Sequence, residues 1–472
     1  MDVEAAMLFV TQKFLGFFLL TFLGYWIIPW HRARTVWLLG ASAVFYMSWN
    51  PWLITLILFS ASVDFVAALA LERTSHRRVR QSILVGSITI NLGLLAYFKY
   101  ANFFLDNVHA LGNWVGFSVQ GPTLELLLPL GISFYTFETI SYIVDVYRGR
   151  TKAERDPVNY ALFILFFPHL IAGPIVRPGD FLPQVPQRKR WNWNRIYLGS
   201  WLILLGIAKK AVLADHLATI IDPIFAHPEQ YSSSACWLAT VGYACQIYGD
   251  FSGYSDIAIG LAHLFGFKLH RNFNLPYLAA SVAEFWRRWH ISLSTWLRDY
   301  LYIPLGGSRH GTWRTNGNLL ITMLLGGFWH GASWNFVLWG ALHGSLLVAH
   351  RTIADRPWLR WLPKPIHIAT TFVCVCVGWI FFRATSTPDA LAIIQRLFWP
   401  FAGERLSPTL AAWALVLIAA TALEHGIRGR RLLDRLVTRL PEPALGALYA
   451  LAIACVFVLM PEDGKGFIYF QF

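Results

Sequence analysis

Charged residues are scarce in this sequence. Asp, Glu, Lys and Arg make up 14% of its 472 residues, whereas a soluble globular domain carries about 25%. Hydrophobic residues make up 56%, and many of them form long apolar runs. So little charge cannot cover a soluble surface of this size. The composition therefore excludes a soluble globular protein and predicts a polytopic membrane protein.

Cysteine and the common catalytic motifs are also scarce or absent. The five cysteines all lie in apolar segments and form no Cys-x-x-Cys pair, so neither a zinc site nor a disulfide framework is expected. The chain has no Gly-x4-Gly-Lys-Ser/Thr, no Gly-x-Ser-x-Gly and no His-Glu-x-x-His. ATP hydrolysis, serine-hydrolase chemistry and zinc peptidase chemistry therefore have no support, and no metal is expected.

Apolar runs that suit a membrane-crossing helix, which takes roughly 20 residues, recur along the chain. Their predicted positions are 6–30, 35–49, 52–71, 81–100, 124–146, 197–213, 234–249, 366–383, 408–423 and 444–460. No internal repeat or low-complexity linker divides them. We therefore expect a single membrane domain over residues 1–472.

Two regions are not simple spans. Residues 157–176 are broken by proline and glycine and are flanked by basic loops, which predicts a re-entrant hairpin. Residues 250–317 are polar and aromatic, with further glycine and proline breaks. Irregular backbone at membrane depth needs protein or a water-filled cavity around it. The chain is therefore expected to enclose a cavity.

The loops between the predicted spans alternate in charge. Loops 72–80, 148–155 and 428–439 are basic, whereas 101–123 and 214–233 contain no Lys or Arg. Lys and Arg gather in cytoplasmic loops, so both ends of the chain are expected outside. The same rule explains the net charge of +13 without nucleic acid, since the basic clusters lie between spans rather than on one folded domain.

Two histidines lie in unusual surroundings. His290 stands among tryptophans and charged residues in 284–307, and His330 lies in the apolar segment Gly-Gly-Phe-Trp-His-Gly of 326–331. Ionisable residues at membrane depth are costly and usually mark a site. A histidine can take a proton from an attacking hydroxyl and return it to a leaving group. The alternative for each is a buried histidine satisfied by a neighbouring helix, and for His290 also an aromatic belt.

Three arginines accompany the first histidine. Arg287, Arg288 and Arg298 form a cluster of guanidinium groups near the expected cavity, and such groups suit phosphate recognition. A nucleotide-bearing acyl donor would fit this cluster, and so would lipid headgroups.

Long stretches of the chain resemble the membrane-bound O-acyltransferase (MBOAT) family, and in particular its bacterial branch for alginate and other polysaccharide O-acetylation. The matching stretches are 128–138, 167–177, 246–258, 285–307 and 328–331. The resemblance extends over about 35–472, with its core motifs in 124–350, and is weakest in 352–460. It implies an all-α bundle of about 10–12 transmembrane helices with re-entrant segments around a central tunnel.

The resemblance also implies roles for the site residues. His330 matches the catalytic histidine of the family, and His290 is expected near it or on the donor side. The expected donor is acetyl-CoA, which would enter from the cytoplasm near Arg287 and Arg288, with Trp286 beside them.

The C-terminal tail supplies a third candidate, Tyr469. Residues 461–472 follow the last predicted span, 444–460, and are rich in aromatic side chains. The tail is similar to the aromatic C-terminal motif of a small single-span protein that works beside the D-alanyl-transferring family member. One reading makes Tyr469 a covalent acyl carrier with His330 as its base, because a phenol with a pKa near 10 is a poor nucleophile alone. The other makes the tail an aromatic anchor at the membrane interface.

The function expected from these features is a membrane O-acetyltransferase of the bacterial inner membrane. It would move acetyl from cytoplasmic acetyl-CoA to an extracytoplasmic acceptor, a polysaccharide such as alginate, through a partner SGNH-type acetyltransferase or a polysaccharide-modifying complex. Other acceptors for the same chemistry are peptidoglycan, cellulose, teichoic acid (D-alanylation) and lipid. The non-enzyme alternative is an anion transporter, which should show inverted repeats with paired broken helices; none is visible.

Overall fold

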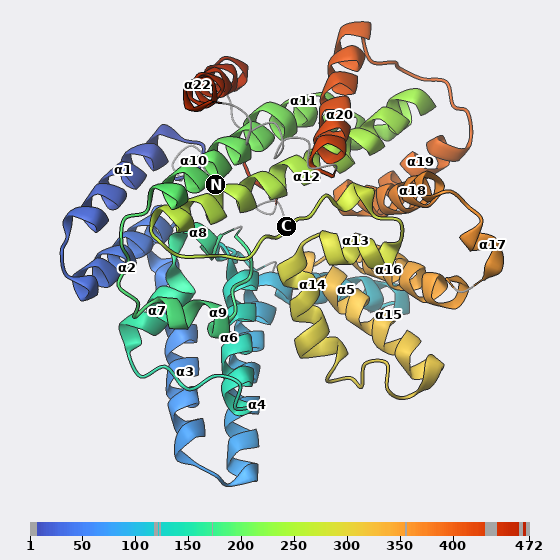
Figure 1. Ribbon diagram of the computed structural model, residues 1–472. Helices are drawn as coiled ribbons and strands as arrows, with labels where there is room; N and C mark the ends of the chain where they lie inside the picture. Colours follow the sequence, from blue (N-terminus) through green and yellow to red (C-terminus); the bar gives the residue numbers. More distant parts are fainter. Residues whose placement is uncertain are drawn as a thin grey trace. The chain divides into compact units, whose positions relative to one another are not determined.

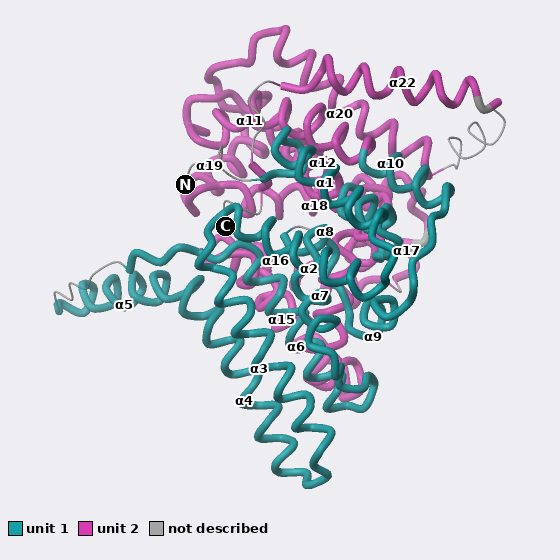
Figure 2. Tube along the Cα trace, turned by 90° about the vertical axis from the view of Figure 1, so that its left-hand side faces the viewer, with its two compact units in different colours: residues 1–203, 257–270 teal, residues 204–256, 271–472 magenta. Residues whose placement is uncertain are grey.

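The computed structural model describes residues 7–117, 121, 124–171, 173–354, 356–429, 441–461 and 466–468. These residues form helices and connecting segments without a β-strand; one isolated bridge joins Tyr231 and Glu404. The predicted all-α fold is confirmed. The chain forms two compact units, unit 1 of Met1–Ile203 with Ile257–His270 and unit 2 of Leu204–Asp256 with Arg271–Phe472 (Figure 2).

The N-terminal helices, labelled in Figure 1, belong to unit 1 (Figure 2). They are α1 (Gln12–Ile27), α2 (His31–Met47), α3 (Ile54–Arg73), α4 (Arg77–Leu95), the π-helical turn η3 (Ala96–Tyr100), α5 (Ala101–Val115), α6 (Ile132–Tyr147), α7 (Pro157–Leu165), α8 (Phe167–Leu170) and α9 (Pro178–Phe181). Helices α10 (Trp193–Ile207) and α12 (Ser233–Leu264) contribute residues to both units.

Helix α6 forms the core of unit 1. It packs against α3, α4 and α7, and every residue from Ile132 to Val146 is buried. Its start differs from the predicted span 124–146, because 124–131 are not helical and the helix begins only after Gly131. Gly131 has φ 71°, a left-handed conformation that favours glycine, so this position ends the extended segment and lets the helix begin.

The predicted break in 157–176 is present. Helix α7 ends at Leu165, and the single turn α8 follows after Phe166. The buried Glu138 of α6 holds the segment that follows. Its carboxylate accepts a hydrogen bond from Val176 N–H (2.9 Å) and lies 3.2 Å from Nδ1 of His169. Two of the stretches that resemble the family therefore meet in one buried contact that supports the fold of unit 1.

Three predicted spans end too early. The observed helical segments run on from 81–100, 197–213 and 234–249 to Val115, Ala226 and Leu264. The parts of the loops 101–123 and 214–233 that precede Val115 and Ala226 are therefore helical, which corrects the prediction.

Buried polar pairs explain these longer helices. Lys99 in η3 donates to Ser133 (3.2 Å), and Lys209, in the second π-helical turn η5 (Ala208–Ala214), donates to Asp256 (2.9 Å). Polar residues that find partners inside the protein can stay in the helix, whereas a hydropathy pattern assigns them to a loop.

Five helical segments are long and apolar enough to cross a membrane. They are Pro51–Arg73, Arg77–Val115, Trp193–Ala226, Lys364–Arg383 and Pro408–Gly429. Two shorter apolar helices, Gln12–Ile27 and Pro443–Leu459, add to them among the described residues. Together they confirm a polytopic membrane protein, and the count of about 10–12 spans and the tunnel stay predictions.

The remaining helices lie in unit 2. They are α11 (Asp215–Ala226), α13 (Val282–Arg288), α14 (Ile291–Leu297), the π-helical turn η8 (Arg298–Tyr302), α15 (Gly311–His330), α16 (Trp334–Ile353), α17 (Pro357–Arg360), α18 (Lys364–Arg383), α19 (Thr387–Phe398), α20 (Pro408–Gly429) and α22 (Glu442–Leu459).

Helices α15 and α16 form a tightly packed hairpin. A Cβ atom at Gly327 would collide with the carbonyl oxygen of Phe336, and one at Gly340 would collide with the carbonyl oxygen of Met323. The glycines thus let two backbones come into direct contact. Helix α16 packs in turn against α18, so three helices meet around the end of α15, where His330 lies.

Candidate active site

His330 lies at the turn of the α15–α16 hairpin. It is the last residue of α15, and Ser333 caps the next helix by accepting a hydrogen bond from Asn335 N–H. The ring is buried and packs edge-on against Trp339 (5.0 Å between ring centroids) and Phe382 (5.1 Å). Three helices therefore enclose a titratable group in an aromatic wall.

His290 lies between α13 and α14 in a left-handed conformation, with φ 41° and ψ 57°. Few residues with a Cβ adopt this region, and it costs of order 1–3 kcal/mol. Its ring is fully buried, and Nδ1 lies 3.2 Å from the side-chain oxygen of Asn272. The same oxygen accepts hydrogen bonds from the backbone N–H and the hydroxyl of Ser292. Buried hydrogen bonds to Asn272 thus hold the strained backbone of His290 in place.

This network fixes the protonation of His290. Because the Asn272 oxygen is an acceptor, Nδ1 of His290 carries the proton and Nε2 carries the lone pair. His290 lies outside the five candidate spans. Burial lowers the pKa of its imidazole from 6.5 to about 3, so the ring is neutral at physiological pH. The structure thus presents Nε2 of His290 as a hydrogen-bond acceptor.

One aromatic cluster contains both histidines. The Trp329 ring lies 6.2 Å from His290 and 5.0 Å from His330. On its other side His290 packs edge-on against Phe251 of α12 (4.6 Å, 88°). The two histidines that the sequence singles out, 40 residues apart by number, are therefore neighbours of the same tryptophan in unit 2.

His343 is a third buried histidine that the sequence prediction missed. Its ring lies 4.8 Å from Trp339 and 5.1 Å from Trp286. Neither ring nitrogen has a hydrogen-bond partner among the described residues. Trp339 thus contacts both His330 and His343. The sequence does contain one signal for His343: it follows Trp339 by four residues on α16. Residues four apart share one face of a helix.

The predicted donor-binding residues have distinct surroundings. Arg288 is half-buried; it donates to Glu284 (2.7 Å) and to the carbonyl oxygen of Asn274 (3.0 Å). Arg287 is exposed and forms no hydrogen bond or ion pair with any described residue. Trp286 packs inside the aromatic cluster, 5.5 Å from Trp339. Arg288 is therefore occupied by the protein itself, whereas the guanidinium of Arg287 faces outward.

Tyr469 lies outside the described residues. The three described residues before it, Gly466 to Ile468, belong to unit 2, and their backbone bonds to Lys210 and Asp250. The Phe467 ring is fully buried and lies 4.3 Å from Tyr254 and 5.8 Å from Phe251. Because Phe251 also contacts His290, the described part of the tail adjoins the histidine cluster.

Among the described residues, no group of three or more His, Cys, Asp or Glu side chains could hold a metal ion. The site holds imidazole groups in an aromatic environment, with arginines nearby. Such an arrangement suits proton transfer during acyl transfer.

Comparison with known proteins decides the family. The sequence profile of MBOAT, the membrane-bound O-acyltransferase family, matches residues 155–387. The chain is 43% identical to a protein named probable alginate O-acetylase AlgI from Pseudomonas aeruginosa, over 83% of this chain and 75% of that protein. The chain belongs to the membrane-bound O-acyltransferase family. It is an O-acyltransferase and a multi-pass membrane protein.

Other relatives of this MBOAT enzyme differ in acceptor. It is 37% identical to the peptidoglycan O-acetyltransferase of Helicobacter pylori, over 82% of this chain and 79% of that protein. It is 29% identical to the teichoic acid D-alanyltransferase of Bacillus subtilis, over 55% of this chain and 70% of that protein. The matched profile includes His290 and His330 and ends before the C-terminal tail.

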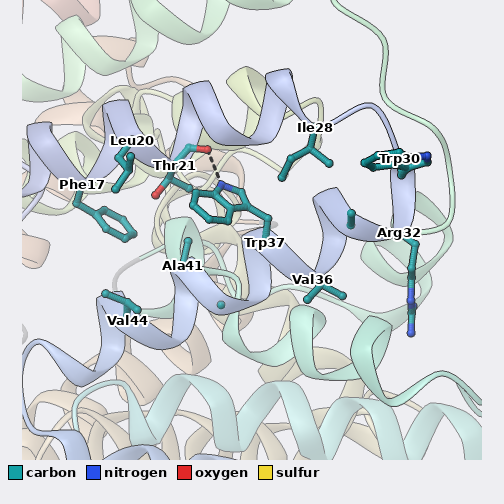
Figure 3. A pocket seen from close by; sticks show the side chains of 12 residues that line it. Phe17, Leu20, Thr21, Ile28, Trp30, Arg32, Val36, Trp37, Ala41 and Val44 are labelled. Carbon is teal, nitrogen blue, oxygen red and sulfur yellow. Dashed lines mark hydrogen bonds between the residues drawn. The ribbon is translucent and has the colours of Figure 1, made fainter.

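A separate apolar groove lies along α1 and α2 in unit 1 of the MBOAT enzyme (Figure 3). Its volume is about 820 Å³, and Trp37 crosses its floor with the indole N–H bonded to the Thr21 carbonyl (3.0 Å). Among the described lining residues Arg32 is the one that carries a charge, and it pairs with Asp156. The groove therefore supplies no base for acyl transfer.

Proposed function

We propose that this enzyme is an O-acetyltransferase that takes acetyl from cytoplasmic acetyl-CoA and passes it to an extracytoplasmic acceptor. The observation that carries the proposal is the single buried cluster that holds His290, Trp329 and His330. The two acetylating relatives described above are 43% and 37% identical to this chain, whereas the D-alanylating relative is 29% identical. This difference favours acetyl over D-alanyl as the group transferred.

In this proposal His330 is the general base. An acceptor hydroxyl gives its proton to the imidazole as its oxygen attacks the acetyl carbonyl carbon. A C–O bond forms, the C–S bond of the thioester breaks, and the imidazolium returns the proton to the departing CoA sulfur. The aromatic wall of Trp339 and Phe382 keeps water away from the thioester. Exclusion of water matters because water would otherwise accept the acetyl group.

His290 lies on the donor side of the cluster in this proposal. Its Nε2 lone pair is a hydrogen-bond acceptor, since Nδ1 is engaged by Asn272. CoA phosphates would meet Arg287, whose guanidinium is exposed. Arg288 acts beside it, and its bonds to Glu284 and the Asn274 carbonyl fix the end of α13. Trp286 would flank the donor from within the aromatic cluster.

Tyr469 is proposed as the group that carries acetyl between donor and final acceptor. The support is the burial of Phe467 and Ile468, the residues just before it, against the helix that also contacts His290. A covalent relay splits one difficult transfer into two easier steps. The first forms an acetyl ester on the phenol, and the second passes the acetyl group on and restores the phenol.

The proposed acceptor is a polysaccharide reached through a periplasmic or cell-surface SGNH-type acetyltransferase, at a bacterial inner membrane with both chain ends outside. The name of the first relative, an alginate O-acetylase, favours this acceptor class. The name of the second, a peptidoglycan O-acetyltransferase, supports peptidoglycan as the other candidate.

Incubation of the purified full-length enzyme with acetyl-CoA labelled in the acetyl group tests the donor. We expect release of free CoA together with label on the protein or on an added acceptor. A D-alanyl thioester offered in parallel should give much less label. Faster labelling from the D-alanyl donor would contradict acetyl transfer.

A further inference from the structure

Two adjacent lysines in η5 each form buried ion pairs. Lys209 lies 2.9 Å from Asp256 and 3.2 Å from Glu424. Lys210 lies 2.8 Å from Asp215 and 2.5 Å from Asp250. The two aspartates of α12 are six residues apart and belong to the stretch 246–258. Each lysine thus has two carboxylate partners, and the two sets do not share a member.

Only the second set contacts the C-terminal tail among the described residues. Lys210 Nζ donates to the carbonyl oxygen of Gly466 (3.2 Å), and Asp250 Oδ2 accepts a hydrogen bond from Ile468 N–H (2.8 Å). The ion pair therefore binds a donor and an acceptor of the tail backbone at the same time. Phe467, between them, is fully buried against Tyr254.

The surroundings of this contact are enclosed and polar. Lys210 and Asp250 are 1% and 3% exposed. A cavity of about 20 Å³ adjoins them and is lined by Asp215, Gly466 and Ile468 as well, a size that suits about one water molecule. Buried charges are costly unless they are paired and fully hydrogen-bonded. Two backbone atoms of the tail, the Gly466 carbonyl oxygen and the Ile468 N–H, bond to this pair. Loss of the tail would therefore leave a buried lysine and a buried carboxylate each short of one hydrogen bond.

We infer that Lys210 and Asp250 are positioning residues that clamp the C-terminal tail against α12, next to the His290–His330 cluster. The clamp grips the backbone on either side of Phe467, and Phe467 extends the contact to Phe251, the neighbour of His290. This inference rests on the proposed function in one respect: it gives the clamp the task of presenting Tyr469 for acetylation. Neither residue touches the thioester or exchanges a proton with it.

Two matched variants test the clamp. Asp250→Ala removes the acceptor for Ile468 N–H but leaves Lys210 paired with Asp215. Asp256→Ala removes one partner of Lys209 but leaves it paired with Glu424. Both variants thus lose one carboxylate of α12 next to a lysine of η5. Only the first loses a bond to the described part of the tail.

Hydrogen–deuterium exchange of the purified full-length protein, followed by mass spectrometry at single-residue resolution, reads out the Ile468 amide. A hydrogen bond to a charged group of this kind corresponds to about 10- to 100-fold slower exchange. We expect that acceleration in Asp250→Ala and the wild-type rate in Asp256→Ala. Equal acceleration in both variants, or none in Asp250→Ala, would overturn the clamp. If Asp250→Ala does not fold, Asp250→Asn should still exchange faster than Asp256→Asn.

A second readout separates the clamp from the relay. After incubation with acetyl-CoA, mass spectrometry of the C-terminal peptide measures acetyl on Tyr469, and binding of acetyl-CoA is measured in parallel. We expect Asp250→Ala to lose most of the acetyl while binding the donor as the wild type does. Acetylation at the wild-type rate with a released tail would refute the positioning role. Absence of acetyl from the wild type would refute the relay and leave the exchange result for the clamp standing.

Discussion

At the scale of single residues, the aromatic cluster holds three buried histidines with different surroundings. His330 lies at a helix end against aromatic rings, and His290 is held by Asn272 in a strained turn. His343 shares Trp339 with His330. These differences predict different consequences when each side chain, or a neighbouring arginine, is replaced.

Replacement of His330 by alanine should abolish acyl transfer without unfolding the protein. Removal of a general base usually lowers the rate by about 10²–10⁴-fold, and the cavity left lies at a helix end rather than inside a helix. CoA release from acetyl-CoA and size-exclusion chromatography in detergent check the two parts. His76→Ala is the control, because His76 is exposed and lies outside the aromatic cluster. Wild-type turnover by a well-folded His330→Ala enzyme would refute the assignment.

Arg287 and Arg288 should both contribute to acetyl-CoA binding, but only Arg288 should contribute to the stability of the fold. Both Arg287→Ala and Arg288→Ala should raise KM for acetyl-CoA more than they lower kcat, as loss of uniform binding does. Arg288→Ala should also lower the free energy of unfolding by up to about 1 kcal/mol, since Glu284 loses its partner. Steady-state kinetics and thermal unfolding distinguish the two variants. Unchanged KM in both would place donor entry elsewhere, with 169–177 the next candidate.

His290 should make the protein less stable in acid. Its pKa in the folded protein is about 3, below the ordinary 6.5. Between these values the unfolded chain binds a proton that the folded chain does not. The stabilisation that the neutral His290 gives the folded protein is therefore fully present above pH 6.5. As the pH falls from 6.5 toward 3, the free energy of unfolding decreases by about 1.4 kcal/mol per pH unit. Thermal unfolding on both sides of pH 6.5 should show a smaller acid loss in His290→Gln. The same dependence of unfolding temperature on pH in wild type and His290→Gln would show that His290 does not cause the acid loss.

At the scale of helices, the α15–α16 hairpin sets the position of His330. The contact between the two helices depends on glycines, because their backbones lie so close together that a Cβ atom would not fit between them. Hydropathy predicts where such a hairpin turns but not how closely its arms pack.

Gly327→Ala and Gly317→Ala should have opposite effects on stability. A methyl group at Gly327 meets the backbone of Phe336 and Gly340, whereas one at Gly317, on the same helix, meets nothing within 4 Å. Overpacking costs about 1–3 kcal/mol, while alanine in place of an unhindered helical glycine gains up to about 1 kcal/mol. Thermal unfolding of both variants checks the signs. Equal effects would mean that the close approach does not hold the hairpin together.

Sequence prediction succeeds at this scale where a segment is apolar throughout. The spans at 366–383 and 408–423 coincide with α18 and with most of α20. It fails where Lys209 and Asp256 pair inside, because a local pattern contains no information about a partner 47 residues away. For the same reason His290 is a visible candidate in the sequence, whereas its contact with Asn272 is not.

At the scale of the whole molecule, the donor and the acceptor are expected on opposite sides of a membrane. Phe467 and Ile468 connect the tail to the cluster within unit 2. A carrier on that tail would explain how a thioester delivered from one side reaches an acceptor on the other.

Tyr469→Phe isolates the chemistry of this carrier from its packing, because it removes the hydroxyl and keeps the ring. The variant should fold and bind acetyl-CoA, yet fail to acetylate the acceptor. Mass spectrometry of the C-terminal peptide should find an added acetyl group in the wild type alone. Full acceptor acetylation by Tyr469→Phe would leave the tail as an interface anchor and favour direct transfer.

The side-chain amide of Asn272 has a consequence for how this enzyme can change by mutation. A single base change in an asparagine codon gives aspartate, which has nearly the same shape. A carboxylate at this position would favour a doubly protonated His290 ring, and Nε2 would then present a proton instead of a lone pair. Aspartate would lose the amide N–H that Asn272 donates to Ser255 Oγ (3.4 Å), and the ring would change from acceptor to donor. Selection on this codon therefore acts on charge and hydrogen-bonding character, in a place where shape would permit either residue.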